Sequence, residues 1–278
     1  MRAVELVKLA AHFSKDDDFP QHIEPAHGHN RSMIATLSQG VAPPKSILRP
    51  AGRAIGDYAM IRPGDRILLG LSGGKDSLGL LHVLLHLRSY APVRFELGVA
   101  TVDPGIDGYD PAPLRSYVET LGLPFFLMRQ AIVKRALDTM RGDSFCAYCA
   151  RMRRGMLYRI AREQGYNVLA LAQHLDDLAE SFLMSVFHGG RLKTMKAHYV
   201  SDAGDLRIIR PFVYVRERQL ADFTRSTALP VIHDNCPACF RVPTERVRVK
   251  ALLAEEERRD WRVFSSILSA IRTIMADK

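Results

Sequence analysis

One junction in the chain, RILLGLSGGKDS at residues 66–77, restricts the possible folds more than any other segment. Its apolar first half is typical of a strand buried in a parallel sheet. A serine-glycine-glycine turn follows, and leucines at helical spacing begin just after Asp76. A strand that leads through glycines onto a helix N-terminus points backbone N–H groups outward, where the helix dipole favours an anion. The junction therefore predicts a phosphate-binding loop at the carboxyl end of a buried strand.

The side chains of this loop narrow the type of phosphate site. The pattern G-x-x-x-x-G-K-[ST] is not met, because position 69 is leucine and Asp76 follows Lys75. SGGKDS instead resembles the pyrophosphate loop of the PP-loop ATPases, which split ATP into AMP and pyrophosphate and use the AMP to activate a carbonyl oxygen. The alternative is a glycine turn with a solvated lysine, and six consecutive matching residues argue against it. The resemblance implies that ATP contacts Ser72, Gly73, Gly74, Lys75, Asp76 and Ser77.

Strands and helices alternate along the rest of the chain, which predicts an α/β fold, a Rossmann-like parallel sheet with helices on both faces. Strands are expected at 66–71, 95–102, 124–128, 167–172, 206–210 and, as a short strand, 230–232. Helices are expected at about 50–60, 76–89, 112–121, 147–164, 176–187 and 216–227. The predicted parts are a partly ordered N-terminal extension (1–48), a domain that binds ATP and carries the cysteines (49–240), and a helical C-terminal segment (241–278).

A second group of polar residues, in LALAQHLDDLAES, follows the strand expected at 167–172. In such sheets ligands bind beyond the carboxyl ends of the strands, so His174, Asp176 and Asp177 can face the same site as the phosphate loop. Two acids at a helix start could simply cap the helix, but an ATP site also needs carboxylates to hold Mg²⁺. The segment resembles the H-x-D-D element of the PP-loop family.

That resemblance implies roles for the polar residues at the strand ends. Asp176 and Asp177 are expected to hold magnesium, and His174 to steady the nucleotide or the adenylated base. Asp103 ends the second expected strand, where relatives hold adenosine. The expected catalytic group is Lys75, Asp76, His174 and Asp177.

Four cysteines form two C-x-x-C pairs, Cys146 with Cys149 and Cys236 with Cys239. In a chain with no evident secretory signal, such pairs favour a metal site over structural disulfides. Zinc bound by all four cysteines is one interpretation, and a redox disulfide is a weaker one. Thiolates suit both zinc and iron, so the pairs alone do not choose the metal.

Several segments together resemble the tRNA-cytidine 2-sulfurtransferases, the TtcA family: CAYCARMRRGMLYRIA, HGGRLKTMKAHYVSD, IIRPFVYVRE and CPAC. The resemblance implies a [4Fe–4S] cluster held by Cys146, Cys149 and Cys239, with Cys236 as a ligand instead or lying nearby. It implies adenylation of the C2 oxygen of cytidine, at position 32 of tRNA, and its replacement by sulfur from the cluster. Alternatives are a thiolase acting on a tRNA uridine and a zinc-stabilised RNA-binding protein that is not an enzyme.

The charge of the chain agrees with a polyanionic partner. The formal net charge is +9, and residues 151–162 carry five arginines. Arg151, Arg153 and Arg154 are expected to contact tRNA beside the cysteines, and later basic sets near 207–218 and 241–250 add to the positive charge. No apolar stretch approaches the roughly 18 residues of a membrane span. The sequence thus favours a cytoplasmic protein, and the resemblance implies a cysteine desulfurase as sulfur source and a possible homodimer.

Overall fold

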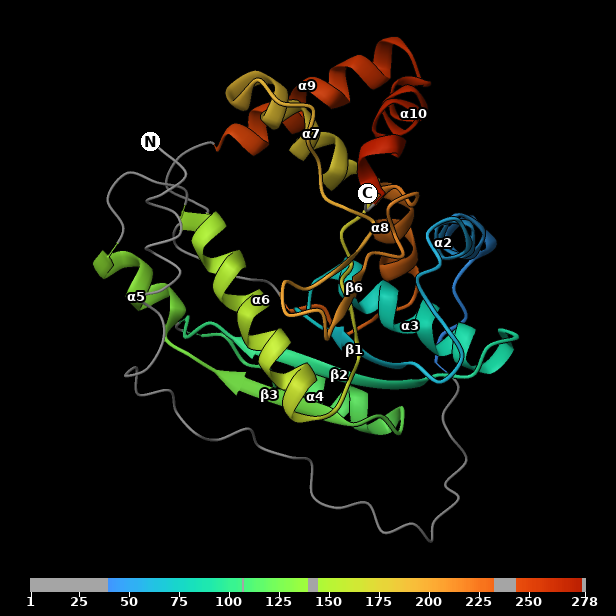
Figure 1. Ribbon diagram of the computed structural model, residues 1–278, viewed down its shortest axis with the longest axis vertical. Helices are drawn as coiled ribbons and strands as arrows, with labels where there is room; N and C mark the ends of the chain where they lie inside the picture. Colours follow the sequence, from blue (N-terminus) through green and yellow to red (C-terminus); the bar gives the residue numbers. More distant parts are fainter. Residues whose placement is uncertain (1–39, 107, 140–144, 233–243, 277–278) are drawn as a thin grey trace, which may run out of the picture.

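The computed structural model describes residues 40–106, 108–139, 145–232 and 244–276. Within them, six strands form one sheet in the order β3-β2-β1-β4-β6-β5 (Figure 1). Neighbouring strands are parallel except β5, which lies antiparallel to β6 at the edge. The strands are β1 (Arg66–Gly70), β2 (Glu96–Asp103), β3 (Phe125–Arg129), β4 (Val168–Ala170), β5 (His198–Val200) and β6 (Arg207–Ile209).

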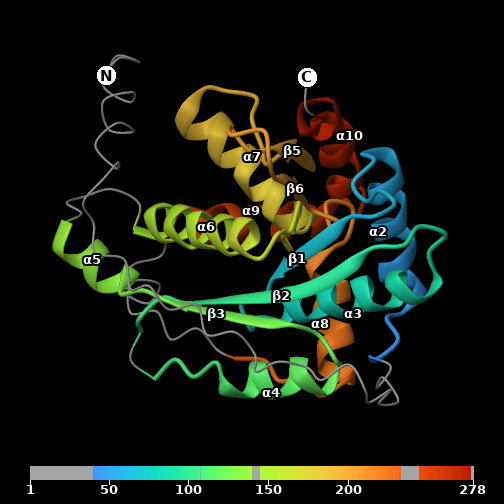
Figure 2. The ribbon, with the colours of Figure 1, turned by 60° about the horizontal axis from the view of Figure 1, so that its bottom comes forward.

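Helices cover both faces of the sheet, as predicted. In Figure 2, α5 and α6 lie on one face, and α3, α4 and α8 lie on the other. The described helices are α2 (Lys45–Asp57), α3 (Lys75–Tyr90), α4 (Ala112–Thr120), α5 (Ile132–Thr139), α6 (Phe145–Glu163), α7 (Leu175–Gly189), α8 (Glu217–Ser226), α9 (Glu245–Arg259) and α10 (Val263–Met275). None of these helices is both long enough and apolar enough to cross a bilayer.

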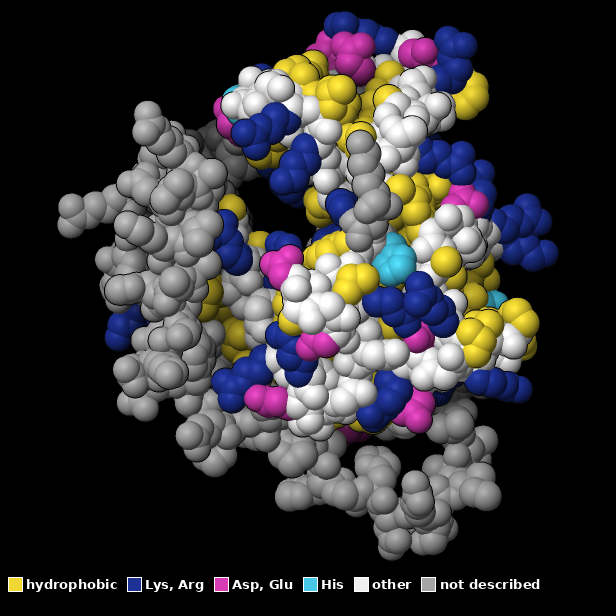
Figure 3. Space-filling model, viewed as in Figure 1, with side chains coloured by type: hydrophobic (Ala, Val, Ile, Leu, Met, Phe, Trp, Pro, Cys, Tyr) yellow, Lys and Arg dark blue, Asp and Glu magenta, His cyan; other side chains and the backbone are white. Residues whose placement is uncertain are grey.

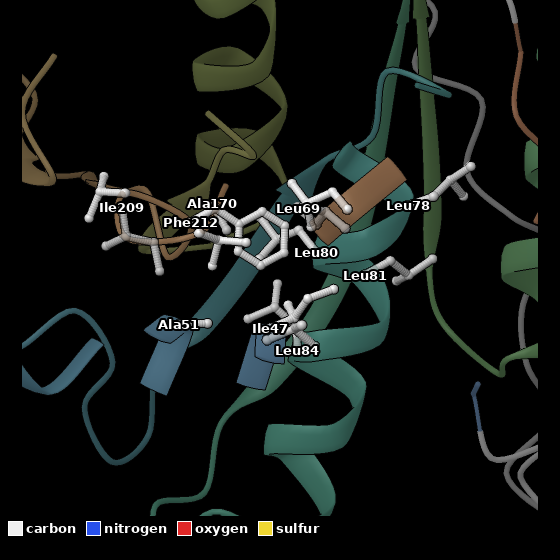
Figure 4. Packing of buried hydrophobic residues seen from close by; sticks show 14 of the residues in the cluster. Ile47, Ala51, Leu69, Leu78, Leu80, Leu81, Leu84, Ala170, Ile209 and Phe212 are labelled. Carbon is white, nitrogen blue, oxygen red and sulfur yellow. The ribbon is translucent and has the colours of Figure 1, made fainter. Parts of the chain in front are cut away.

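The strand sequences are apolar on both faces because both faces are buried. Successive side chains of a strand point to opposite faces, so each strand contributes to two clusters. One row across the sheet packs against α2 and α3 (Figure 4), and it consists of Val99, Leu69, Ala170 and Ile209. The adjacent row packs on the α6 side and consists of Leu68, Leu169 and Ile208. This burial fixes the register of the strands, and with it the edge at which the polar residues collect.

Three short elements differ from the expectation. The helix α5 and the strand β5 were not predicted, because eight and three residues carry too little periodicity to be recognised. The short strand expected at 230–232 is wrong. Residues 231 and 232 join no strand, and the Ile232 amide instead donates to the carbonyl of Gly73 at 2.9 Å. An apolar segment here therefore packs against the phosphate loop rather than extending the sheet.

The boundaries of the folded part also differ from the expectation. Helix α2 begins at Lys45 and buries Ile47 completely, so the fold starts before the expected boundary at residue 48. At the other end, α9 and α10 pack against α7, and Figure 1 shows the three helices grouped together. Val249 and Phe264 belong to the same hydrophobic cluster as the sheet. The C-terminal helices are therefore part of the main core, and residues 1–39 lie outside the described residues.

Candidate active site

The loop between β1 and α3 is ordered by its own two serines. The Ser72 and Ser77 hydroxyl oxygens lie 3.1 Å apart, and the Ser77 hydroxyl donates to the Gly74 carbonyl at 2.9 Å. Gly74 is the N-cap of α3, and its first turn receives no side-chain cap. The N–H groups of that turn are therefore available to an anion, where the helix dipole favours negative charge. This is the arrangement that the SGGKDS sequence predicts.

Gly73 is required at its position for two reasons. Its φ of +87° lies in the left-handed region, which L residues with a side chain rarely adopt. A Cβ atom there would also lie 3.1 Å from side-chain atoms of Ile232 and Leu114. The side of the loop that faces Ile232 and Leu114 is thus closely packed, and only the opposite side is left for a ligand.

Lys75 is held by two carboxylates in this site. Its Nζ atom lies 3.0 Å from Asp76 and 3.0 Å from Glu217, which begins α8. Burial by itself would lower the pKa of Lys75, but these two acids raise it above its usual value. Burial would likewise raise the pKa of Glu217, yet hydrogen bonds from Lys250 and Lys75 lower it to about 2. The lysine is therefore a fixed positive charge at the start of α3.

His174 connects the phosphate loop to α7. Its Nδ1 atom accepts from the Asp177 amide at 3.3 Å, and the Asp177 carboxylate accepts from the His174 amide at 3.1 Å. This reciprocal cap is a capping box, so both residues do cap the helix. The His174 Nε2 atom lies 3.7 Å from Asp76. The imidazole is buried, and it joins the two polar elements that the sequence placed apart.

The carboxylate of Asp176 accepts hydrogen bonds from partners that the sequence did not indicate. Arg216 donates to both of its carboxylate oxygens at 3.0–3.2 Å, and the Glu217 amide donates to it at 2.7 Å. Both side chains of the Arg216–Asp176 pair are only 12% exposed. Arg216 also binds Glu257 and stacks on Phe264, with 3.3 Å between guanidinium carbon and ring centroid. In this structure Asp176 therefore anchors α8 and α9 to α7 rather than facing the phosphate loop.

Replacing Asp176 with asparagine should consequently lower the free energy of unfolding and leave the magnesium affinity nearly unchanged. Arg216 would stay buried with one of its two acidic partners lost, and breaking a buried ion pair costs about 3–5 kcal/mol. Chemical denaturation should show this loss, and a magnesium titration should show little change. A variant with normal stability and lost magnesium affinity would instead identify Asp176 as a metal ligand.

Asp76 and Asp177 fit the magnesium role better. The Oδ1 atom of Asp76 is buried and has no hydrogen-bond partner among the described residues, so it is suited to bind a cation. Burial is the main reason that the pKa of Asp76 is raised, and the nearby charge of Asp177 adds to the shift. A divalent cation beside both carboxylates would stabilise their ionised forms, and carboxylate oxygens are the preferred ligands of Mg²⁺.

Four further residues of the site were not predicted as site residues. Glu217 lies within IIRPFVYVRE, a segment used above only for its resemblance, and Glu180 is one turn after Asp176. Arg246 and Lys250 belong to a basic set interpreted as facing nucleic acid. Arg246 lies 3.2 Å from Asp177 and 3.4 Å from Glu180, and Lys250 lies 2.6 Å from Glu217. Their pairing across three helices has no signal in the local sequence.

Asp103 ends β2, the strand next to β1, so it lies on the same edge of the sheet as the phosphate loop. Its carboxylate accepts from the Gly105 amide at 2.9 Å and pairs with Arg129 at 3.3 Å. The neighbouring Thr101 donates to the carbonyl of Leu71 at 2.9 Å. Asp103 therefore shapes the turn after β2, at the position where adenosine is expected.

The first cysteine pair begins helix α6. Cys146 is the second residue of the helix and Cys149 follows three residues later, with its side chain buried at 9% exposure. Because α6 leads from β3 back to the start of the parallel strand β4, its first turn lies at the carboxyl edge of the sheet. The second pair, Cys236 and Cys239, falls outside the described residues.

The arginines expected to contact RNA follow the cysteines on α6. Arg151 and Arg154 are exposed, and Arg153 is half-buried. Figure 3 shows Lys and Arg side chains on either side of a hollow between the α6 and α7 regions. The helix that carries the cysteines therefore also presents positive charge to solvent.

Residues 48–255 match the family model of the PP-loop domain. The tRNA-cytidine(32) 2-sulfurtransferase of Geobacter sulfurreducens is 40% identical over 231 residues, covering 83% of this chain and 90% of that protein. The protein of the same name from Pelobacter propionicus is 42% identical over 224 residues, covering 80% of this chain and 83% of its own length. Both matches extend over most of each chain, so they include the phosphate loop and the α7 acids.

The fold also matches that of a solved structure, the U34-tRNA thiolase NcsA from Methanococcus maripaludis with its [4Fe–4S] cluster. The TM-score is 0.67 at 22% sequence identity, over 84% of this chain and 79% of that chain. At this identity the likeness establishes the shared fold.

Proposed function

Since this chain belongs to the tRNA-cytidine(32) 2-sulfurtransferases of the PP-loop family, we propose that it uses ATP to replace the C2 oxygen of a tRNA cytidine, at position 32, with sulfur. One observation carries the proposal. The uncapped first turn of α3, which carries Lys75 and Asp76, meets His174 and Asp177 of the α7 start at the edge of the sheet where the cysteine-bearing helix α6 also begins. The proposed reaction needs an ATP site that activates the base and a sulfur site that delivers the new atom, and both must face the same substrate.

The phosphate loop and Lys75 act on ATP, and Asp103 lies where adenosine is expected. The C2 oxygen of cytidine attacks the α-phosphate and pyrophosphate leaves, which converts the oxygen into part of a good leaving group. Lys75, fixed by Asp76 and Glu217, neutralises charge that develops on the phosphates during this step. His174, buried against Asp76, steadies the nucleotide or the adenylated base.

Asp76 and Asp177 are the proposed magnesium ligands. The unpartnered Oδ1 atom of Asp76 supports this assignment, and Asp176 is better explained by its ion pair with Arg216. When bound, Mg²⁺ neutralises phosphate charge beside Lys75. The capping box at His174 holds the Asp177 carboxylate near the phosphate loop.

Cys146, Cys149 and Cys239 are the proposed ligands of a [4Fe–4S] cluster. Thiolates from one helical turn, one of them buried at the carboxyl edge, form a donor set that fits such a cluster. Three protein thiolates would leave one iron of such a cluster able to bind sulfide, and this sulfide would be the nucleophile that replaces the C2 oxygen, which leaves as part of AMP. A zinc ion closed by four cysteines would have no position from which to deliver sulfur.

The remaining partners follow from this chemistry. Arg151, Arg153 and Arg154 hold the tRNA backbone beside the cysteines, and an anticodon loop suits the site because an unpaired base leaves its stack at low cost. A cysteine desulfurase as sulfur source, a cytoplasmic location and a homodimer are proposed from the family resemblance alone. Each of these is part of the proposal.

The test is thiolation of defined tRNAs by chain purified without oxygen. Transcripts that differ only in cytidine or uridine at position 32 are incubated with ATP, Mg²⁺ and a sulfide source, and their nucleosides are identified by mass spectrometry. We expect 2-thiocytidine together with pyrophosphate release. Thiouridine alone would indicate a uridine thiolase, and tRNA binding without pyrophosphate release would indicate an RNA-binding protein.

A further inference from the structure

Helix α9 directs two of its basic side chains toward the acids of the active site. Arg246 lies 3.2 Å from Asp177 and 3.4 Å from Glu180, and Lys250 lies 2.6 Å from Glu217. The two are four residues apart, so they project from one face of the helix. Both side chains are about half exposed, at 47% and 54%. They are thus within reach of a ligand as well as of the acids.

We propose that Arg246 and Lys250 bind the β- and γ-phosphates of ATP, and the pyrophosphate that leaves, so that α9 completes the phosphate site begun by α3. This inference rests on the proposed use of ATP at the SGGKDS loop. It assigns to the polyphosphate a part of the basic sequence at 241–250 that composition alone would assign to RNA. Nothing in the fold of the sheet itself requires these two residues.

The first support is the link between Lys250 and Lys75. One oxygen of Glu217 accepts from Lys75 at 3.0 Å and the other accepts from Lys250 at 2.6 Å. A single carboxylate therefore holds the ammonium groups of α3 and α9 side by side. The lysine of the phosphate loop already faces the phosphates, so a second ammonium group next to it is placed for the same ligand.

The second support is the balance of charge around the site. Asp177, Glu180 and Glu217 are all partly or fully buried acids. In the free protein these acids hold Arg246 and Lys250 beside the phosphate loop. Oxygens of a polyphosphate compete for the same guanidinium and ammonium groups, which form their strongest hydrogen bonds with ionised acceptors.

The third support is that α9 is held rigidly next to an open space. Arg216 binds Glu257 of α9 at 2.7 and 2.9 Å and packs on Phe264 of α10, so Lys250 starts from a fixed backbone. A cavity of about 270 Å³ lies between α7, α8, α9 and α10. Its charged lining residues are Asp176, Glu180, Arg216, Glu217, Arg218, Lys250 and Glu257. Lys250 and Glu217 both line this cavity, so the Lys250 side chain borders open space beside Glu217.

Phosphate groups reach this site from two sources, ATP and the RNA backbone, and binding experiments separate them. The affinities of the full-length chain for Mg²⁺-pyrophosphate and for ATP are measured by calorimetry without tRNA, and tRNA affinity is measured separately. The variants are Arg246→Ala, Lys250→Ala and Lys250→Arg. Arg258→Ala is the matched control, because it removes an exposed positive charge two turns further along α9. Thermal denaturation verifies that each variant folds.

Each alanine variant should weaken pyrophosphate and ATP binding by roughly ten- to a hundredfold, the usual effect of losing a charged hydrogen bond. Affinity for tRNA should change less than about twofold, which is the effect of a minor phosphate contact. Lys250→Arg should retain most of the affinity for pyrophosphate, and Arg258→Ala should retain all of it.

The inference is overturned if the alanine variants bind pyrophosphate normally, and a parallel loss of tRNA affinity would assign the two residues to RNA instead. If Arg246→Ala fails to fold because Asp177 and Glu180 lose their partner, the half-exposed Lys250 still decides the question. A wild-type chain that binds pyrophosphate through Lys250 but thiolates no cytidine would contradict the proposed function and support this inference. The two failures are therefore distinguishable.

Discussion

Replacing Lys75 with alanine should reduce tRNA-dependent pyrophosphate release by about a hundred- to a thousandfold, the effect of removing one preorganised donor from a developing anion. Lys75 is the first residue of α3, and Asp76 and Glu217 fix the position of its ammonium group. Burial lowers the pKa of its ammonium group, but the two acids raise it by more, so the group keeps its charge at neutral pH. Release is measured by a coupled pyrophosphate assay with saturating tRNA.

Two controls accompany the Lys75 variant. Lys45→Ala removes an exposed lysine from the start of α2, a helix that contributes no residue to the phosphate loop, and should leave the rate unchanged. Iron and acid-labile sulfide should stay at wild-type levels in Lys75→Ala, because the cysteines of α6 form a separate centre. Loss of iron in that variant would contradict the division of the site into an ATP centre and a sulfur centre.

Replacing Cys149 with alanine should remove the iron and sulfide and lower thiolation to below about one hundredth of the wild-type rate, since the cluster is the proposed sulfur donor. Alanine is small and apolar, so it suits the buried position of Cys149 on α6. ATP and pyrophosphate binding should remain, because the phosphate loop belongs to another helix. The measurements are metal and sulfide analysis and an absorption spectrum after anaerobic purification.

Cys239→Ala extends the same experiment to the second cysteine pair. We expect about four irons and four sulfides per wild-type chain, as in a [4Fe–4S] cluster, and a marked loss in both variants. Cys236→Ala should retain more of the cluster than Cys239→Ala if Cys239 is the third ligand. One zinc and no sulfide in wild-type protein that has never met oxygen would overturn the cluster and favour a zinc-stabilised enzyme.

The α/β fold could be predicted because its signals are local. The run at 67–71 is apolar at every position because β1 is covered on both faces, and this pattern distinguishes a central parallel strand. The loop after it could be predicted for the same reason, since its turn, helix start and donors all lie within six residues. The short elements α5 and β5 lacked such a signal.

The partners of the acids could not be predicted from the sequence. Asp176 and Asp177 are adjacent, yet one is buried against Arg216 and the other lies beside His174, with Arg246 at its outer oxygen. The strand-to-helix turn brings both aspartates to the carboxyl edge of the sheet, but the direction of each side chain depends on which helices pack there. Those helices begin about 40 and 70 residues later in the chain.

The sheet, the phosphate loop and the positions of the cysteine pairs follow from local sequence, because strand burial and helix starts depend on neighbouring residues. Long-range packing, in contrast, sets the bridge from Lys75 through Glu217 to Lys250, the pairing of Asp176 with Arg216 and the approach of α9 to the candidate active site. These pairings join residues that are distant in the chain, and the burial of apolar residues such as Val249 and Phe264 brings them together. The sequence shows which residues are acidic and which are basic, but packing of the core selects which of them pair.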